Sequence, residues 1–175
     1  MTNEQGFTLV EVLLAAFLIT VGLVGLFSVV PVASFALTDG YRLSTATFLA
    51  EQKLEEVRNM PWTSTPAKDC LGVSATASAA PTVPAGNSCT LGATTVNAGG
   101  ALPWFADQAT NTITGFPGYS RTVRITNCGV GAGCSGVVDP LLRSVVVTVT
   151  YRAGSAVALS STNKPVTVTM MVSQR

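Results

Sequence analysis

The stretch that decides the fold is residues 6–37, which read GFTLVEVLLAAFLITVGLVGLFSVVPVASFAL. After Glu11 this stretch contains no further charged residue. About 20 apolar residues suffice to cross the hydrocarbon core of a bilayer, because an α-helix rises about 1.5 Å per residue. Since the uncharged run is longer than that, the sequence predicts a membrane-spanning helix with one carboxylate near its start.

The whole chain is apolar and nearly neutral. Of its 175 residues, 47% are hydrophobic and 11% are charged, and the formal net charge is +1. This balance gives no general attraction to nucleic acid or to anionic lipid, so no nucleic-acid partner is expected. Histidine, the most common general base and metal ligand, is absent. Beyond the predicted helix about 115 residues remain, enough for one domain with its own core.

The acidic residues beyond the helical region give no basis for catalysis. Asp69, Asp107 and Asp139 are isolated from one another, and no nucleophile motif accompanies them. We therefore expect no catalytic residues, no metal site and no cofactor. Aromatic side chains could form a binding surface, but they are more often anchors of a core or a loop. The aromatic residues in question are Trp62, Trp104, Phe105 and Phe116.

The helical pattern continues beyond the apolar segment and becomes one-sided. From Thr38 onward apolar residues recur at spacings of three and four, and charged residues mostly occupy the other faces. Such a stripe is typical of a helix that packs one face on a core. Pro61 predicts the end of the helix, since the residue before a proline disfavours helical geometry. The predicted stripe is Leu43, Ala46, Ala50, Leu54 and Val57, and the charged residues are Arg42, Glu51, Lys53, Glu55, Glu56 and Arg58.

Three segments near the C-terminus alternate in polarity as β-strands do. They are residues 121–126, 143–151 and 165–173, and they contain many β-branched residues. This period-two alternation predicts half-buried antiparallel strands. The predicted fold class is therefore α+β, with a long N-terminal helix whose second half packs on a C-terminal antiparallel sheet of about three or four strands.

The region between helix and sheet contains two of the four cysteines. Residues 62–120 are rich in Ala, Thr, Ser, Gly and Pro, which predicts irregular chain at the surface. An even number of cysteines in an exported domain predicts two disulfides, and the absence of close cysteine pairs argues against a metal site. Neighbours in sequence allow Cys70–Cys89 and Cys128–Cys134, but four cysteines permit three pairings.

A cleavable secretory signal is the main alternative for the N-terminus. The apolar run is about twice as long as the core of such a signal. The leader Met1–Gln5 contains no Lys or Arg, whereas a signal normally begins with positive charge. Ser34-Phe35-Ala36 nevertheless forms a small-x-small sequence, and cleavage there would produce a chain that starts at Leu37.

A family resemblance is carried by residues 6–15, which read GFTLVEVLLA. Glycine, an aromatic residue and glutamate at this spacing before an apolar helix resemble the N-terminus of the type IV prepilins, a family that includes the secretion pseudopilins. The resemblance implies that a prepilin peptidase of the inner membrane cuts between Gly6 and Phe7 and N-methylates Phe7. It also implies that the mature chain assembles into a filament through its N-terminal helix.

Glu11 is the candidate assembly residue. An ionisable group in an apolar helix is costly and is by default a functional candidate. After a cut at Gly6 it would be the fifth residue of the mature chain, and the resemblance implies that it pairs with the amine of Phe7 on a neighbouring subunit. Two alternatives remain, namely a position at the level of the lipid headgroups and a contact with the amine of its own chain.

The resemblance also implies an organisation and a set of partners. The partners are the prepilin peptidase, other pilin or pseudopilin subunits, the inner-membrane assembly platform and, before assembly, membrane lipid. The expected location is the inner membrane with a periplasmic domain, and afterwards an extracellular pilus or a periplasmic pseudopilus. The expected parts are a leader (1–6), a long helix (7–60, with a transmembrane and assembly part 7–37 and an amphipathic part 38–60) and a globular domain (61–175, with a variable loop region 62–120 and a sheet 121–175).

The kind of subunit is indicated by two further segments. Val21–Leu26 and Phe48–Arg58 resemble the pilus-modification class of minor pilins, so a minor subunit of a type IV pilus is the expected function. Secretion pseudopilins can carry a segment similar to Phe48–Arg58, which makes a minor pseudopilin of a type II secretion system the first alternative. The second alternative is a periplasmic binding module anchored by one helix, for which Glu11 would be incidental.

Overall fold

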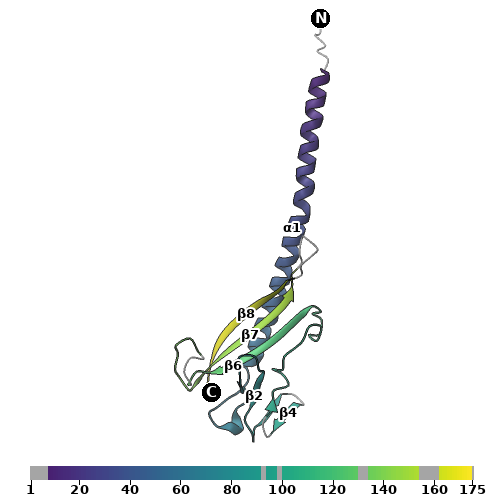
Figure 1. Ribbon diagram of the computed structural model, residues 1–175. Helices are drawn as coiled ribbons and strands as arrows, with labels where there is room; N and C mark the ends of the chain where they lie inside the picture. Colours follow the sequence, from purple (N-terminus) through teal and green to yellow (C-terminus); the bar gives the residue numbers. More distant parts are fainter. Residues whose placement is uncertain (1–7, 92–93, 98–99, 130–133, 154–161, 175) are drawn as a thin grey trace.

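The computed structural model describes residues 8–91, 94–97, 100–129, 134–153 and 162–174. One helix, α1 (Leu9–Arg58), contains 50 residues and is therefore about 75 Å long. Its first half extends away from the rest of the molecule, and its second half lies against a β-sheet (Figure 1). The structure is α+β, as the sequence predicts.

Both ends of α1 follow from local chemistry. The backbone N–H of Glu11 donates to the side-chain oxygen of Thr8 at 3.3 Å, so Thr8 caps the start of the helix. Asn59 caps the other end, two residues before Pro61. These bounds lie within two residues of the predicted ones. The helix continues through Pro31 without interruption.

The main sheet has three antiparallel strands in the order β6-β7-β8. They are β6 (Tyr119–Asn127), β7 (Leu142–Arg152) and β8 (Asn163–Ser173). In the middle of the sheet Val147 lies opposite Val123 on one side and Val168 on the other. All three predicted strands are confirmed, each one to two residues longer at one or both ends than the sequence pattern indicates.

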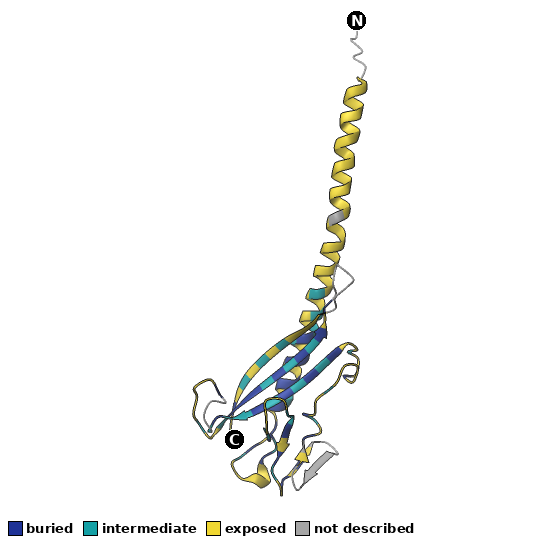
Figure 2. Ribbon diagram, in the orientation of Figure 1, coloured by how far each residue is buried: buried dark blue, intermediate teal, exposed yellow. Residues whose placement is uncertain are grey.

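The second half of α1 packs one stripe on β7 and β8. Its buried residues follow spacings of three and four, and two of the sequence expectations are wrong. Leu43 remains 48% exposed because it lies at the margin of the domain, where the exposed half of α1 begins (Figure 2). Lys53 is buried because seven residues are almost two full turns, which places it below Ala46 at the centre of the stripe. The buried stripe is Ala46, Leu49, Ala50, Lys53, Leu54, Val57 and Met60.

The region before β6 is more ordered than its composition indicates. Its short elements are η1 (Pro66–Lys68), a sheet in the order β1-β2-β5 made of β1 (Val73–Ser74), β2 (Pro81–Val83) and β5 (Gly100–Ala101), and a pair made of β3 (Ser88–Leu91) and β4 (Thr94–Asn97). The expectation of irregular surface chain is therefore wrong in part. Strands of two to four residues are too short to show a period in the sequence.

This region also closes the hydrophobic core. Trp62, Leu71, Leu102 and Phe105 are almost completely buried. They belong to one cluster with the stripe of α1 and the inward residues of β6 and β7. Trp104 and Phe116 are partly buried against the same cluster. The interpretation of the four aromatic residues as core or loop anchors is confirmed.

Truncating the centre of the stripe should destabilise the domain strongly. We expect Leu49→Ala to lower the free energy of unfolding by about 2–5 kcal/mol, because it leaves a cavity in a closed core. Leu43→Ala, on the same helix, should cost about 0.5 kcal/mol or less, because that side chain is half exposed. Urea unfolding of the full chain in detergent micelles, followed by tryptophan fluorescence, measures both, since the two tryptophans lie in the domain. Equal losses for the two variants would contradict the observed stripe.

Candidate assembly site

Glu11 lies in the first turn of α1, next to the capping residue. Its backbone N–H donates to the carbonyl oxygen of Thr8 at 3.0 Å as well as to the threonine side chain. The side chain of Glu11 is exposed. A negative charge in the first turn of a helix interacts favourably with the helix dipole. The carboxylate is therefore compatible with the helix start and available to a group outside this chain.

A shallow depression with a volume of about 540 Å³ runs along α1 beside Glu11. It is lined by Glu11, Val12, Ala15, Ala16 and Ile19. The two alanines leave little side-chain bulk next to the carboxylate. Small residues allow the backbone of a second helix to approach closely in an apolar environment. This face of α1 can therefore accept another helix near Glu11.

The first half of α1 has no cover from its own domain. Within the part of the chain that the structure describes, α1 is the one helix that is long and apolar enough to cross a membrane. The most apolar window of this helix buries none of its residues inside the molecule. Figure 2 shows the described residues of the exposed half almost entirely in yellow. An apolar surface of this size requires lipid or protein as its partner.

Polar contacts hold the second half of α1 to the domain at its buried face. Arg121, on β6, donates through Nη1 to the carbonyl oxygen of Leu49 at 2.9 Å and through Nε to the side-chain oxygen of Gln108 at 2.8 Å. Burial lowers the pKa of Arg121, with an opposing effect of Glu56. The guanidinium thus joins α1, β6 and the chain before β6.

Lys53 is the matching cation on the helix. Its ammonium group donates to the carbonyl oxygen of Trp104 at 2.8 Å and pairs with Glu56 one turn further along. Burial lowers the pKa of Lys53, whereas the hydrogen bond and charge of Glu56 raise it. The Trp104 contact ties α1 to a segment 51 residues away in sequence.

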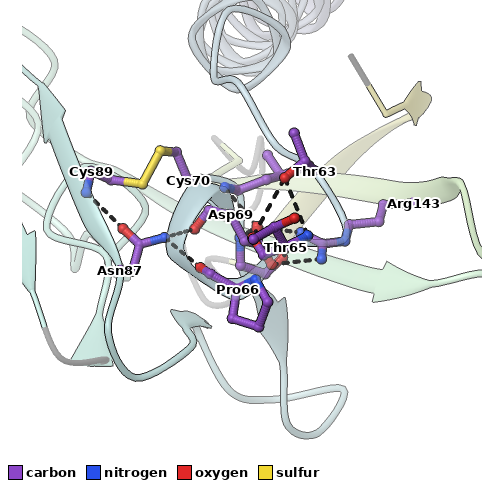
Figure 3. The surroundings of a disulfide bond; sticks show 10 residues. Thr63, Thr65, Pro66, Asp69, Cys70, Asn87, Cys89 and Arg143 are labelled. Carbon is purple, nitrogen blue, oxygen red and sulfur yellow. Dashed lines mark hydrogen bonds and ion pairs between the residues drawn. A yellow bond between two sulfur atoms is a disulfide. The ribbon is translucent and has the colours of Figure 1, made fainter.

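A buried ion pair joins the chain before β6 to the central strand. The guanidinium of Arg143, on β7, donates to both carboxylate oxygens of Asp69 at 2.6 and 2.7 Å (Figure 3). The same carboxylate accepts the backbone N–H groups of Leu71 and Gly72 at 3.1 and 2.9 Å. The ring of Trp62 lies 4.0 Å from the guanidinium carbon, a cation–π distance.

The turn at Gly72 depends on the absence of a side chain. Gly72 has φ +68°, and a Cβ atom there would lie 2.5 Å from the carbonyl oxygen of Thr82. Any other residue would therefore push β2 away from the turn. This close approach keeps the N–H of Gly72 in reach of Asp69.

Two disulfides are present, Cys70–Cys89 and Cys128–Cys134, with Cα–Cα distances of 5.3 and 5.2 Å. Of the three pairings that the sequence permits, the structure has the one between sequence neighbours. Next to the first disulfide, the side-chain oxygen of Asn87 accepts the N–H of Cys89 at 2.7 Å, and its amide donates to the carbonyl oxygens of Pro66 and Asp69 (Figure 3). This disulfide therefore holds the chain directly after Asp69, the residue that pairs with Arg143.

Comparison with known proteins gives one match. Residues 1–27 match the family described as the prokaryotic N-terminal methylation motif. No curated protein and no solved structure matches the chain. The motif marks the chain as a type IV pilin-like or pseudopilin-like precursor, and it is the recognition site of a prepilin peptidase. It implies a structural subunit, and pilins assemble with other pilin subunits.

The predicted site residues are only partly within view of the structure. Gly6 and Phe7 lie within the matched motif but outside the residues that the structure describes. Glu11 is exposed, as an assembly residue must be, and its pairing remains a prediction. Sequence reasoning missed the buried polar groups of the domain. A signal existed for Arg121 and Arg143, because both are in phase with the buried valines of their strands.

Neutralising Asp69 should be far more costly than neutralising an exposed acid. We expect Asp69→Asn to lower the free energy of unfolding by about 3–5 kcal/mol, because it leaves the Arg143 guanidinium buried without a counter-ion. The side chain of Asp107, which pairs with Arg124, is 45% exposed. Asp107→Asn should therefore lower the free energy of unfolding by about 1 kcal/mol or less. Urea unfolding measured by fluorescence compares the two. A loss for Asp69→Asn no greater than that for Asp107→Asn would show that the buried pair is not a support of the domain.

Proposed function

We propose that this chain is a minor subunit of a type IV pilus, processed between Gly6 and Phe7, N-methylated at Phe7, and assembled through the first half of α1. The observation that carries the proposal is the single carboxylate of Glu11 in an exposed helix that is otherwise uncharged from residue 9 to 37 and overlaps the methylation motif. Nothing in a purely passive anchor requires a charge at this position.

The charge pattern supports assembly between helices. In the membrane the apolar half of α1 is covered by lipid, and in a filament neighbouring helices would replace the lipid. The carboxylate of Glu11 would then meet the amine of Phe7 from the next subunit, and methylation keeps that amine charged. Two opposite charges attract each other more strongly in an apolar filament core than in water. The small residues Ala15 and Ala16 leave room for the neighbour's helix.

The location and the kind of subunit follow from further features. The two disulfides suit a domain on the periplasmic side of the inner membrane, where an oxidising environment maintains them. In this orientation the N-terminus faces the cytoplasm, and the subunit reaches the filament through an inner-membrane assembly platform. Val21–Leu26 favours a minor pilin, and Phe48–Arg58 is shared with pseudopilins, so a minor pseudopilin of a type II secretion system is the second candidate.

The native N-terminus gives the first test. Intact-mass analysis of the protein from its own membranes should give a chain without residues 1–6 that begins with methylated Phe7. The reason is that the motif is cut after its glycine. A chain that starts at Leu37 would indicate a secretory signal instead, and one that retains Met1 would indicate an unprocessed anchor. Recovery of the wild-type chain in sheared extracellular filaments favours the pilus, whereas confinement to the cell envelope favours the pseudopilus.

Substitution of Glu11 tests the assembly mechanism. Glu11→Ala should leave membrane insertion and cleavage intact but lower the ratio of subunit in filaments to subunit in membranes by about tenfold, as expected for the loss of roughly 1.4 kcal/mol of charge pairing. Glu11→Gln should be almost as defective, because it keeps the shape and loses the charge. Glu11→Asp should restore assembly in part.

Thr20→Ala provides a matched control in the same exposed helix. The hydroxyl of Thr20 donates to the carbonyl oxygen of Ala16 in its own helix, at 2.7 Å, so this variant removes a polar group without removing a charge. It should enter filaments like the wild type. If Glu11→Ala also enters filaments normally, the carboxylate is no assembly determinant, and the anchored binding module becomes the better explanation.

A further inference from the structure

The charges of the globular part are unevenly distributed. We use the name basic rim for Asp39, Arg42, Arg152 and Lys164, which together carry a net charge of +2. The other charged residues in the described part of the domain balance one another. They are the cations Lys53, Arg58, Lys68, Arg121, Arg124 and Arg143, and the anions Glu51, Glu55, Glu56, Asp69, Asp107 and Asp139. The entire positive excess of this part of the chain therefore lies in the basic rim.

The basic rim is a connected structure. Arg42 donates through Nη1 to the backbone carbonyl oxygen of Arg152 at 2.5 Å, and Lys164 pairs with Asp39 at 2.6 Å. These contacts attach the end of β7 and the start of β8 to one turn of α1. Figure 1 shows that this end of the sheet lies beside α1 where the helix leaves the domain. Because Lys164 neutralises Asp39, the unbalanced charge belongs to the two arginines.

The position of the basic rim along α1 matches the layer of lipid headgroups. The apolar run of α1 ends at Leu37, and Asp39 is the first charged residue after it. Asp39 and Arg42 therefore lie about 3 and 8 Å beyond the apolar run along the helix axis. The headgroup layer on each side of a bilayer is about 5–8 Å thick. When Leu37 lies at the outer edge of the hydrocarbon core, the rim lies in this layer or at its outer surface.

The basic rim also has a recess of suitable chemistry. A cavity of about 230 Å³ is lined by Arg42 and Arg152 and by the two tyrosines Tyr119 and Tyr151, whose ring centroids are 6.1 Å apart. Among the described residues Arg42 donates to one acceptor, the carbonyl oxygen of Arg152, and its guanidinium carries five donors in all. Arginine is well suited to phosphate because its planar fork can bind two oxygens. Tyr119 and Tyr151 are buried members of the core, so they form the inner wall of this recess.

We propose that the basic rim binds anionic phospholipid headgroups of the membrane that α1 spans, with Arg42 and Arg152 contacting the lipid phosphate. This inference rests on the membrane-spanning role of α1 within the proposed function. The contact holds the domain against the bilayer before assembly, at a defined angle to the helix. When the subunit enters a filament the rim leaves the headgroups, so anionic lipid favours the membrane-bound form over the assembled one.

The test compares the full chain in lipid nanodiscs of phosphatidylcholine with the chain in discs where phosphatidylglycerol replaces part of this lipid. Tryptophan fluorescence follows thermal unfolding of the domain, since no tryptophan lies in α1. We expect phosphatidylglycerol to raise the unfolding midpoint by about 4–8 °C at low salt. The rise should fade at about 0.5 M salt, where charges are screened beyond a few Å.

Two variants locate the effect. Arg152→Gln should remove at least half of the midpoint rise, and it keeps the backbone carbonyl that accepts from Arg42. Arg58→Gln makes the same charge change on an exposed residue of α1 that lies about 24 Å beyond Arg42 along the helix axis. This variant should retain the full rise of the midpoint. An equal loss of the rise in both variants would indicate a general charge effect and would overturn the proposal.

Three other outcomes are decisive. Equal midpoints of the wild type in both lipids would overturn the proposal. A rise in phosphatidylcholine discs on addition of inorganic phosphate, as large as that with phosphatidylglycerol, would assign the recess to soluble anions and would also overturn it. Failure of the chain to co-purify with any nanodisc would instead refute the membrane-spanning role of α1, a result distinct from the loss of the lipid effect alone.

Discussion

A buried cation must find a partner, and this requirement organises the globular domain. Lys53 on α1, Arg121 on β6 and Arg143 on β7 all point into the interior. Each takes a partner from the chain before β6, since the partners are the carbonyl of Trp104, the side chain of Gln108 and the carboxylate of Asp69. Without a partner, each of these buried cations would destabilise the domain by more than the packing of its side chain stabilises it. The chain before β6, whose composition predicts irregular structure, is therefore held against the core by these three contacts.

The regular elements could be predicted from the sequence because each has a period. The helix, its membrane-length apolar run and the three long strands all follow from spacings of three to four or of two. The same periodicity, applied to charged residues, would have placed Lys53, Arg121 and Arg143 inside. Their partners could not be predicted, because residues 62–118 show no period and their path is set by tertiary contacts. The disulfide pairing could not be predicted for the same reason, since it depends on which cysteines the folded path of the chain brings together.

The two halves of α1 differ in how their apolar side chains are kept from water. The second half exposes polar residues and gives one stripe to its own domain, so it is complete within a single chain. The first half is apolar on every side and is incomplete in any single chain in water. The helix changes from one type to the other between Leu37 and Asp39. It therefore joins a folded domain to a segment whose apolar surface must be covered by lipid or by other protein chains. The methylation motif at its start is consistent with that division.

The Cys70–Cys89 bond adds a dependence on compartment. It joins two cysteines with a sequence separation of 19. Near its two ends lie Asp69, whose carboxylate pairs with Arg143 of β7, and Asn87, whose amide donates to the carbonyl oxygen of Asp69. A cross-link of this kind restricts the unfolded chain more than the folded one. In a reducing compartment the loop lacks that restriction, and openings that expose the Arg143 pair become more frequent. The domain is therefore least accessible to proteases in an oxidising compartment, where this disulfide forms and persists.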